Sequence, residues 1–153
     1  MKQRFCADNN LVVDGATGLM WSRDAAPAEF PLNWQETFAF LEELNSQGFE
    51  GHQDWRLPNR RELFSLIRHD RINPALPADH PFENVFPGYY WSATTSLYET
   101  RYAWALYLKD GAVGVGFKEN PEFFTWPVRG GKTFQTSGQR KNQAGSTYSA
   151  SSD

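Results

Sequence analysis

Near the middle of the chain lies the segment Asp54-Trp55-Arg56-Leu57-Pro58-Asn59-Arg60-Arg61-Glu62-Leu63. Its first half alternates charged and large apolar residues, and a proline then breaks the backbone pattern. Asn59 stands three residues before Glu62, which is the spacing of a helix capping box. The segment therefore predicts a break followed by a short helix that ends near Arg68. That helix is expected to present three side chains to the core: Leu63, Leu66 and Ile67.

Asp54 and Arg56 in this segment have two interpretations. Both side chains could contact a ligand, or both could form an internal ion pair or bond neighbouring backbone while Trp55 and Leu57 fill the core. We favour the structural interpretation, because buried charges persist mainly when they are paired.

A second capping box precedes a longer helix. Asn33 stands three residues before Glu36, and apolar residues then recur at intervals of three and four. Gly48 is a natural stop for such a helix. The pattern predicts a helix over residues 34–47 with one buried stripe: Trp34, Phe38, Leu41 and Leu44.

The two ends of the chain predict β-structure. Residues 11–13 and 19–21 are apolar runs on either side of a turn-forming cluster, which indicates an opening hairpin. A strand over 102–108, the turn Asp110-Gly111 and a return strand over 112–117 predict a second hairpin, and a last strand is expected over 123–129. Gly114 and Gly116 leave space on the return strand, which we expect a ring of Trp104 or Tyr107 to fill.

Between these parts, residues 71–88 carry four prolines: Pro74, Pro77, Pro81 and Pro87. Each removes a backbone donor and disfavours helix at the residue before it. We expect a long ordered loop here. Residues 132–153, by contrast, contain almost nothing apolar and predict a flexible polar tail or linker.

Composition limits the function. The chain has 153 residues, 40% of them hydrophobic, which suffices for one core, and its net charge of −3 provides no global field for nucleic acid. Cys6 is the one cysteine, so no disulfide can form within the chain. No run approaches the roughly 20 apolar residues of a membrane span, and the first residues do not have the apolar core of a secretory signal.

Aromatic and basic residues leave further alternatives. Tyr90 and Trp91 could stack on a sugar, but at most one of two neighbours in a regular strand points outward, and Trp91 is the better core candidate. The region 56–71 is rich in arginine and could bind a polyanion. We favour a solvated helix face for that region.

Metal sites and catalysis have little support in the residue pattern. The three histidines lie far apart without the ligand spacing of a zinc site, whereas calcium stays open because loop carbonyls can bind it. Residues Glu119-Asn120-Pro121 have the wrong order for the Glu-Pro-Asn triplet of calcium-dependent lectins. No nucleophile elbow or P-loop motif occurs. We expect no enzyme activity and no resident cofactor.

Four short motifs in order carry a family resemblance: Thr17-Gly18-Leu19-Met20-Trp21, the 54–63 segment, Tyr90-Trp91-Ser92-Ala93-Thr94-Thr95 and Val128-Arg129-Gly130-Gly131. Over roughly residues 4–131 the chain resembles the Lcl C-terminal domain family, named for a Legionella collagen-like adhesin and grouped with C-type lectin-like folds. The resemblance implies an α+β domain over 1–131, with two helices packed on a small, mainly antiparallel sheet and long irregular loops. It also suggests a cell-surface, extracellular or virion location.

In domains of this type, loops around the last β-hairpin present a ligand surface, and the resemblance places them at residues 96–102 and 118–123. The candidate ligand-binding residues are Tyr98, Glu99, Arg101, Tyr102, Lys118, Glu119, Asn120 and Glu122. The predicted function is non-catalytic recognition of a protein or glycan, as at the tip of an adhesin, pilus or phage fibre. The alternative is a structural or assembly subunit that self-associates or joins a complex, with the tail taking part.

Overall fold

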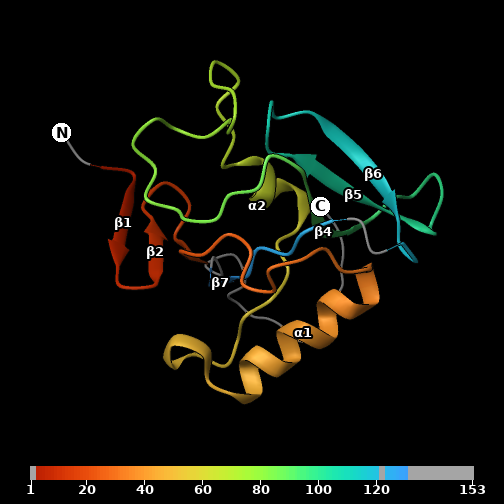
Figure 1. Ribbon diagram of the computed structural model, residues 1–153, viewed down its shortest axis with the longest axis horizontal. Coiled ribbons are helices and arrows are strands. Elements are labelled where there is room, and N and C mark those ends of the chain that lie inside the picture. Colours follow the sequence, from red (N-terminus) through yellow and green to blue (C-terminus); the bar gives the residue numbers. More distant parts are fainter. Residues whose placement is uncertain (1–2, 121–122, 131–153) are drawn as a thin grey trace.

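The computed structural model describes residues 3–120 and 123–130, which form an α+β domain with two small antiparallel sheets (Figure 1). In chain order the strands are β1 (Phe5–Asp8), β2 (Leu11–Asp14), β3 (Leu19–Ser22), β4 (Tyr89–Thr95), β5 (Tyr102–Tyr107), β6 (Val113–Phe117) and β7 (Val128–Gly130). The helices are α1 (Trp34–Ser46) and α2 (Arg60–Phe64), with a short 3-10 turn, η1 (Phe49–Gly51), between them. The predicted α+β class is therefore confirmed, although the strands divide between two sheets where one was expected. The predicted tail, residues 132–153, lies outside the described residues.

The first sheet has the order β1-β2-β3-β7 and unites the two ends of the described chain. The predicted hairpin between β2 and β3 is present, with Val12 opposite Trp21. Strand β1 was not predicted. The last strand is also shorter than the expected 123–129, because Phe123 and Phe124 instead form single bridges to Leu32 and Tyr90 and only β7 joins the sheet.

The second sheet has the order β4-β5-β6, and the predicted Asp110-Gly111 hairpin joins its last two strands. Gly111 adopts a φ of +85°, which is accessible to glycine at little cost. Rings do lie against Gly114 and Gly116, but they belong to Tyr89 and Phe123. The expectation of Trp104 or Tyr107 was wrong, because packing against these glycines comes from β4 and from the segment after β6.

Both capping boxes are formed as the spacing predicted. The Asn33 side chain accepts from the Glu36 N–H while the Glu36 carboxylate accepts from the Asn33 N–H, and Asn59 and Glu62 repeat the arrangement. Helix α1 ends at Ser46, one residue before the predicted limit, and Gly48 follows in the left-handed conformation. The predicted stripe buries Leu41 and Leu44 fully and leaves Trp34 and Phe38 half-buried.

The core consists of two clusters on opposite sides of β4. Tyr90 belongs to the cluster with Leu63 and Leu66 near α2, whereas Trp91 belongs to the cluster with Leu41 and Leu44 of α1. Both rings are fully buried. A strand covered on both faces leaves neither neighbour for a sugar, so stacking on Tyr90 or Trp91 is excluded.

Residues 71–88 contain no helix or strand, as predicted, yet they are held firmly. The N–H of Ala75 donates to the carbonyl of Leu108, and the N–H of Arg68 donates to the carbonyl of Ala75. Leu76 and Phe82 are buried in the first cluster. Within the described residues, neither helix has the length and apolar character needed to cross a bilayer.

Candidate functional site

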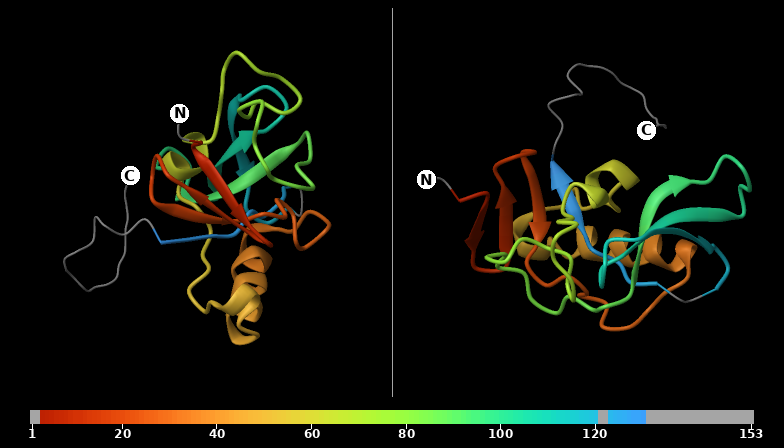
Figure 2. Two further views of the ribbon diagram at one scale, coloured as in Figure 1. Left: turned by 90° about the vertical axis from the view of Figure 1, so that its left-hand side faces the viewer. Right: turned by 90° about the horizontal axis from the view of Figure 1, so that it is seen from above.

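The two predicted loops lie side by side at one end of the three-stranded sheet, although Phe123, the last residue of the second predicted loop, is buried in the core. We call the loop 96–101 and residues 118–120 together the tip surface (Figures 1 and 2). The N–H of Lys118 donates to the carbonyl of Arg101 at 2.9 Å, and Tyr102 pairs with Phe117 in the ladder just below. The loops are therefore adjacent because β5 and β6 are paired up to their ends.

The most exposed large side chains of the tip surface are Leu97 and Tyr98, which are 90% and 94% exposed. Beside them Arg101 binds the Glu99 carboxylate with two hydrogen bonds of 3.1 and 2.8 Å. The hydrogen bonds from Arg101 lower the pKa of Glu99 to about 2. Glu99 is thus ionised throughout the physiological range, and the tip presents a fixed charge pair next to an exposed ring.

Other predicted residues support the tip rather than project from it. The Lys118 ammonium lies 4.1 Å from the centre of the Trp34 ring and donates to Thr95 Oγ1 at 2.9 Å. Burial lowers the pKa of Lys118. Tyr102 is half-buried against Phe117, with ring centres 5.4 Å apart. These contacts fix the loops against α1 and the sheet.

The structure therefore brings together the predicted residues that it describes. Glu119 and Asn120 are exposed at the same end of the sheet. Glu122, the remaining predicted residue, lies outside the described residues. The contact between Arg60 and Trp104, 4.7 Å from guanidinium carbon to ring centre, was missed because it joins α2 to β5, which are far apart in the sequence.

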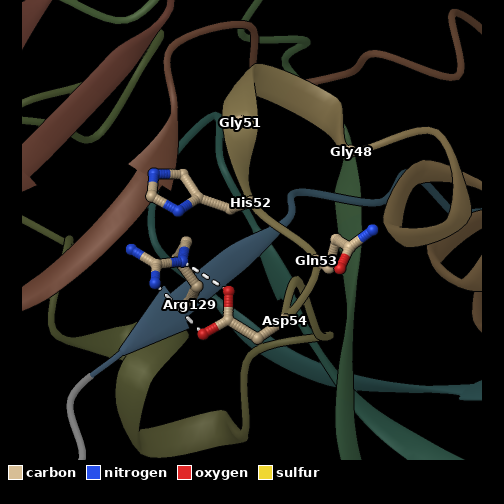
Figure 3. Close-up of a pocket in the computed structure, with 6 residues that line it drawn as sticks. All are labelled: Gly48, Gly51, His52, Gln53, Asp54 and Arg129. Carbon is tan, nitrogen blue, oxygen red and sulfur yellow. Dashed lines mark hydrogen bonds and ion pairs between the residues drawn. The ribbon is translucent and has the colours of Figure 1, made fainter.

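A hollow of about 470 Å³ lies at the other end of α1, lined by Gly48, Gly51, His52, Gln53, Asp54 and Arg129 (Figure 3). Part of its lining is an ion pair in which Arg129 donates to the Asp54 carboxylate at 2.6 and 3.1 Å. The Arg129 hydrogen bond lowers the pKa of Asp54. Because the two charges satisfy each other, the hollow offers no unpaired charge from this pair.

The ion pairs around the hollow differ from the internal pair that was one expectation for Asp54 and Arg56. Asp54 and Arg56 do not bind each other. Arg56 instead donates to both Glu62 carboxylate oxygens at 2.7 Å and to the Gly130 carbonyl at 2.8 Å, and thereby ties the start of α2 to β7. The structural interpretation otherwise holds, since Trp55 and Leu57 are buried in the second cluster.

The arginine-rich region is largely engaged within the domain. Arg56 pairs with Glu62, Arg68 pairs with Asp70 at 2.6 Å, and Arg60 lies over Trp104. Arg61, Arg68 and Arg71 are nevertheless exposed, in keeping with the solvated face that was favoured for the region. Among the described residues, no group of three or more His, Cys, Asp or Glu side chains is placed to hold a metal ion.

Fold and surface together define a class: a small α+β domain whose paired strands and capped helices hold irregular loops at one end. The family follows from the sequence match. The chain belongs to the Lcl C-terminal domain family, whose model matches residues 10–129 and so spans the structure from just before β2 into β7. Comparison with curated proteins and with solved structures gave no match.

Proposed function

We propose that this protein is a non-catalytic recognition domain with a C-type lectin-like fold, which binds a protein or glycan through the tip surface. Family membership supports a binding role. The observation that carries the proposal is the exposure of Leu97 and Tyr98 on a loop whose ends are held by backbone hydrogen bonds, from Ser96 to Tyr102 and from Lys118 to Arg101. Large apolar side chains at a rigid, exposed position are a cost in isolation and an advantage in binding.

The chemistry of the tip surface suits recognition. Tyr98 offers contact area and a hydroxyl group at small entropic cost, as tyrosines do in antibody paratopes. Arg101 and Glu99 add a donor and an acceptor whose positions are fixed by their mutual hydrogen bonds. Both side chains keep more than 40% of their surface exposed, so a partner can add hydrogen bonds to the pair and gain orientation.

The proposal includes no resident cofactor and no chemical step. The binding screen described below also tests calcium dependence, because carbonyl oxygens of the loops could coordinate a calcium ion in a complex. The proposed setting is the displayed end of an adhesin, pilus or phage fibre.

The test is a glycan and surface-protein binding screen of the full chain, run with calcium and with chelator. Tyr98→Ala and Arg101→Ala are each expected to weaken binding to the identified ligand at least tenfold, while Tm stays within about 2 °C of the parent. Ile72→Ala is the matched control, since Ile72 is also exposed but lies outside the tip surface. Unchanged affinity in both tip variants, or equal loss with Ile72→Ala, would contradict the proposal.

A second candidate function is that of an assembly subunit. Val113 and Val115 on β6 are exposed apolar residues outside the tip surface, and such residues favour contact with another subunit. Light scattering coupled to size exclusion, on the chain with and without residues 132–153, separates the possibilities. A complex that needs the tail favours assembly, whereas a tail-independent monomer that binds ligand favours display.

A further inference from the structure

Strand β6 forms one edge of the three-stranded sheet (Figure 1). Its backbone N–H and C=O groups point alternately toward β5 and toward the open edge. At one end the N–H of Lys118 donates to the carbonyl of Arg101, and at the other the N–H of Tyr107 donates to the carbonyl of Ala112. Antiparallel pairing alternates, so even-numbered residues of β6 direct their backbone groups to β5. The odd-numbered residues direct theirs to the open edge: Val113, Val115 and Phe117.

This edge lacks the usual protection against pairing. Soluble proteins guard edge strands with charges, prolines or bulges. Residues 113–117 read Val-Gly-Val-Gly-Phe and contain none of these, and their register with β5 is unbroken. Val113 and Val115 are 52% and 44% exposed. In the part of the chain that the structure describes, no other strand pairs with this edge.

The sequence of β6 is complementary to itself about Val115. If a second copy aligned antiparallel with Val115 opposite Val115, Val113 would face Phe117 of the other copy and glycine would face glycine. That register also fits the backbone phase, because the residues that then share hydrogen-bonded pairs are those with groups at the open edge. Pairing centred on Gly114 or Gly116 keeps the same phase but pairs fewer residues of β6, whereas a one-residue shift would set odd-numbered residues opposite glycines and point half of the required groups toward β5.

Side chains on both faces agree with this register. On one face it creates aromatic and β-branched cross-strand pairs, which stabilise sheets by roughly 0.2–1 kcal/mol each. Trp104 lies opposite Val115 on β5, so the apolar surface continues across the junction. On the other face only glycine pairs meet. Nothing on this strand obstructs the approach of a second backbone.

Charges at the two ends do not oppose this register. Lys109 and Asp110 precede β6, while Lys118 and Glu119 follow it. Each end therefore carries one base and one acid, and antiparallel alignment does not set an end of one sign against its like.

We propose that two copies of this chain associate through β6 in antiparallel register about Val115, forming a continuous six-stranded sheet. Each Val115 N–H donates to the Val115 carbonyl of the other copy, and each Phe117 N–H donates to the opposite Val113 carbonyl. The Phe117 carbonyl already accepts from the Asn120 N–H in its own turn, so it adds less. One short strand per copy is less than a standard interface, so the dimer forms reversibly and at high protein concentration. Its formation needs no ligand at the tip surface.

The first experiment is sedimentation equilibrium of the full chain from about 10 μM to 1 mM, a range that covers weak association. A concentration-dependent dimer is expected. Val115→Lys sets like charges directly opposite each other and is expected to give a monomer with a Tm within about 2 °C of the parent. Val13→Lys is the matched control, because Val13 is exposed on the other sheet and its variant should still dimerise.

A second experiment tests the register. In a Cys6→Ser background, Val115→Cys should form a disulfide-linked dimer on mild oxidation, because paired Cα atoms lie about 5.5 Å apart, within disulfide range. Val113→Cys should not, since its counterpart lies four residues away along the strands, at roughly 13 Å. A parent chain that is monomeric up to 1 mM, or equal cross-linking at both positions, would overturn the proposal. A monomer that binds an extended peptide at β6 would assign the edge to another protein.

Discussion

Replacing Gly116 with alanine tests how tightly the Phe123 ring of the second core cluster packs against strand β6. A Cβ atom at Gly116 would lie 2.8 Å from Cζ and 2.9 Å from Cδ2 of the Phe123 ring, and closer still to Cε2. Ordinary contact begins near 3.4 Å. The ring cannot retreat freely, because its centre lies 5.0 Å from the Tyr89 ring and 4.6 Å from the Trp91 ring, and Trp91 is fully buried.

Overpacking of a close-packed core costs about 1–3 kcal/mol, and the depth of this overlap places Gly116→Ala in the upper part of that range. The free energy of unfolding should fall by about 2–3 kcal/mol, which corresponds to a Tm lower by roughly 6–15 °C. Gly114→Ala is the matched control on the same strand. Its Cβ would lie 3.1 Å from the edge of the half-buried Tyr89 ring, so a loss below about 1 kcal/mol is expected.

Urea unfolding followed by tryptophan fluorescence measures both variants, with the slope m as a check that the same surface is exposed. The double variant Gly116→Ala/Phe123→Ala should lose less than the sum of its single variants, because the new methyl group occupies part of the space left by the ring. Equal losses for Gly114→Ala and Gly116→Ala, or strict additivity in the double variant, would refute the packing argument.

Two further predictions concern ion pairs. Glu62→Gln should lower the free energy of unfolding by about 1–2 kcal/mol, because it weakens the two hydrogen bonds from Arg56. Glu36→Gln alters a capping box alone and should lower it by less than about 0.5 kcal/mol. Denaturant titration measures both variants, and equal losses would contradict the prediction. The pKa of Asp54 is lowered by its hydrogen bond with Arg129, so its contribution is present above the ordinary carboxyl pKa near 3.8 and is lost as pH falls through the lower folded value. Because Asp54 is 60% exposed, Asp54→Asn should cost less than about 1 kcal/mol at pH 7, and the Tm difference from the parent should shrink below pH 4; a difference that grows with acid would show that the sign is wrong.

Local signals in the sequence were sufficient for the starts of both helices and for the hairpins, although α2 ends at Phe64, before the predicted limit near Arg68. Asn33 and Asn59 mark helix starts because the capping box is a contact between residues three apart, and Asp110-Gly111 marks a turn for the same local reason. The opening hairpin and the proline-rich loop followed from equally short-range chemistry. The overall α+β class could thus be predicted.

Contacts between distant residues could not be predicted. The partner of Asp54 is Arg129, and the ring against Gly116 is Phe123, which reaches the strand from beyond the end of the hairpin. Strand β1 was missed because its residues, Phe-Cys-Ala-Asp, become a strand only by pairing with β2. The spacing of apolar residues along the sequence does not indicate which distant residues or strands become partners.

For the candidate site, too, some features could be predicted from the sequence and others could not. The resemblance and the positions of the turns placed residues 96–102 and 118–123 near each other, and the structure places residues 96–101 and 118–120 side by side. The inward direction of Lys118 could not be read from the sequence, because it depends on Trp34 at the start of α1. Which tip residues contact a ligand stays a prediction.

Strand β7 is fastened along both of its sides, which determines how the domain would carry mechanical tension. One side bonds to β3, and the other exchanges two backbone hydrogen bonds between Val128 and Arg56. The Arg56 side chain also holds the Gly130 carbonyl. A pull along β7 would therefore load these bonds together in shear, rather than open them one after another. Such a strand would yield late under stretching.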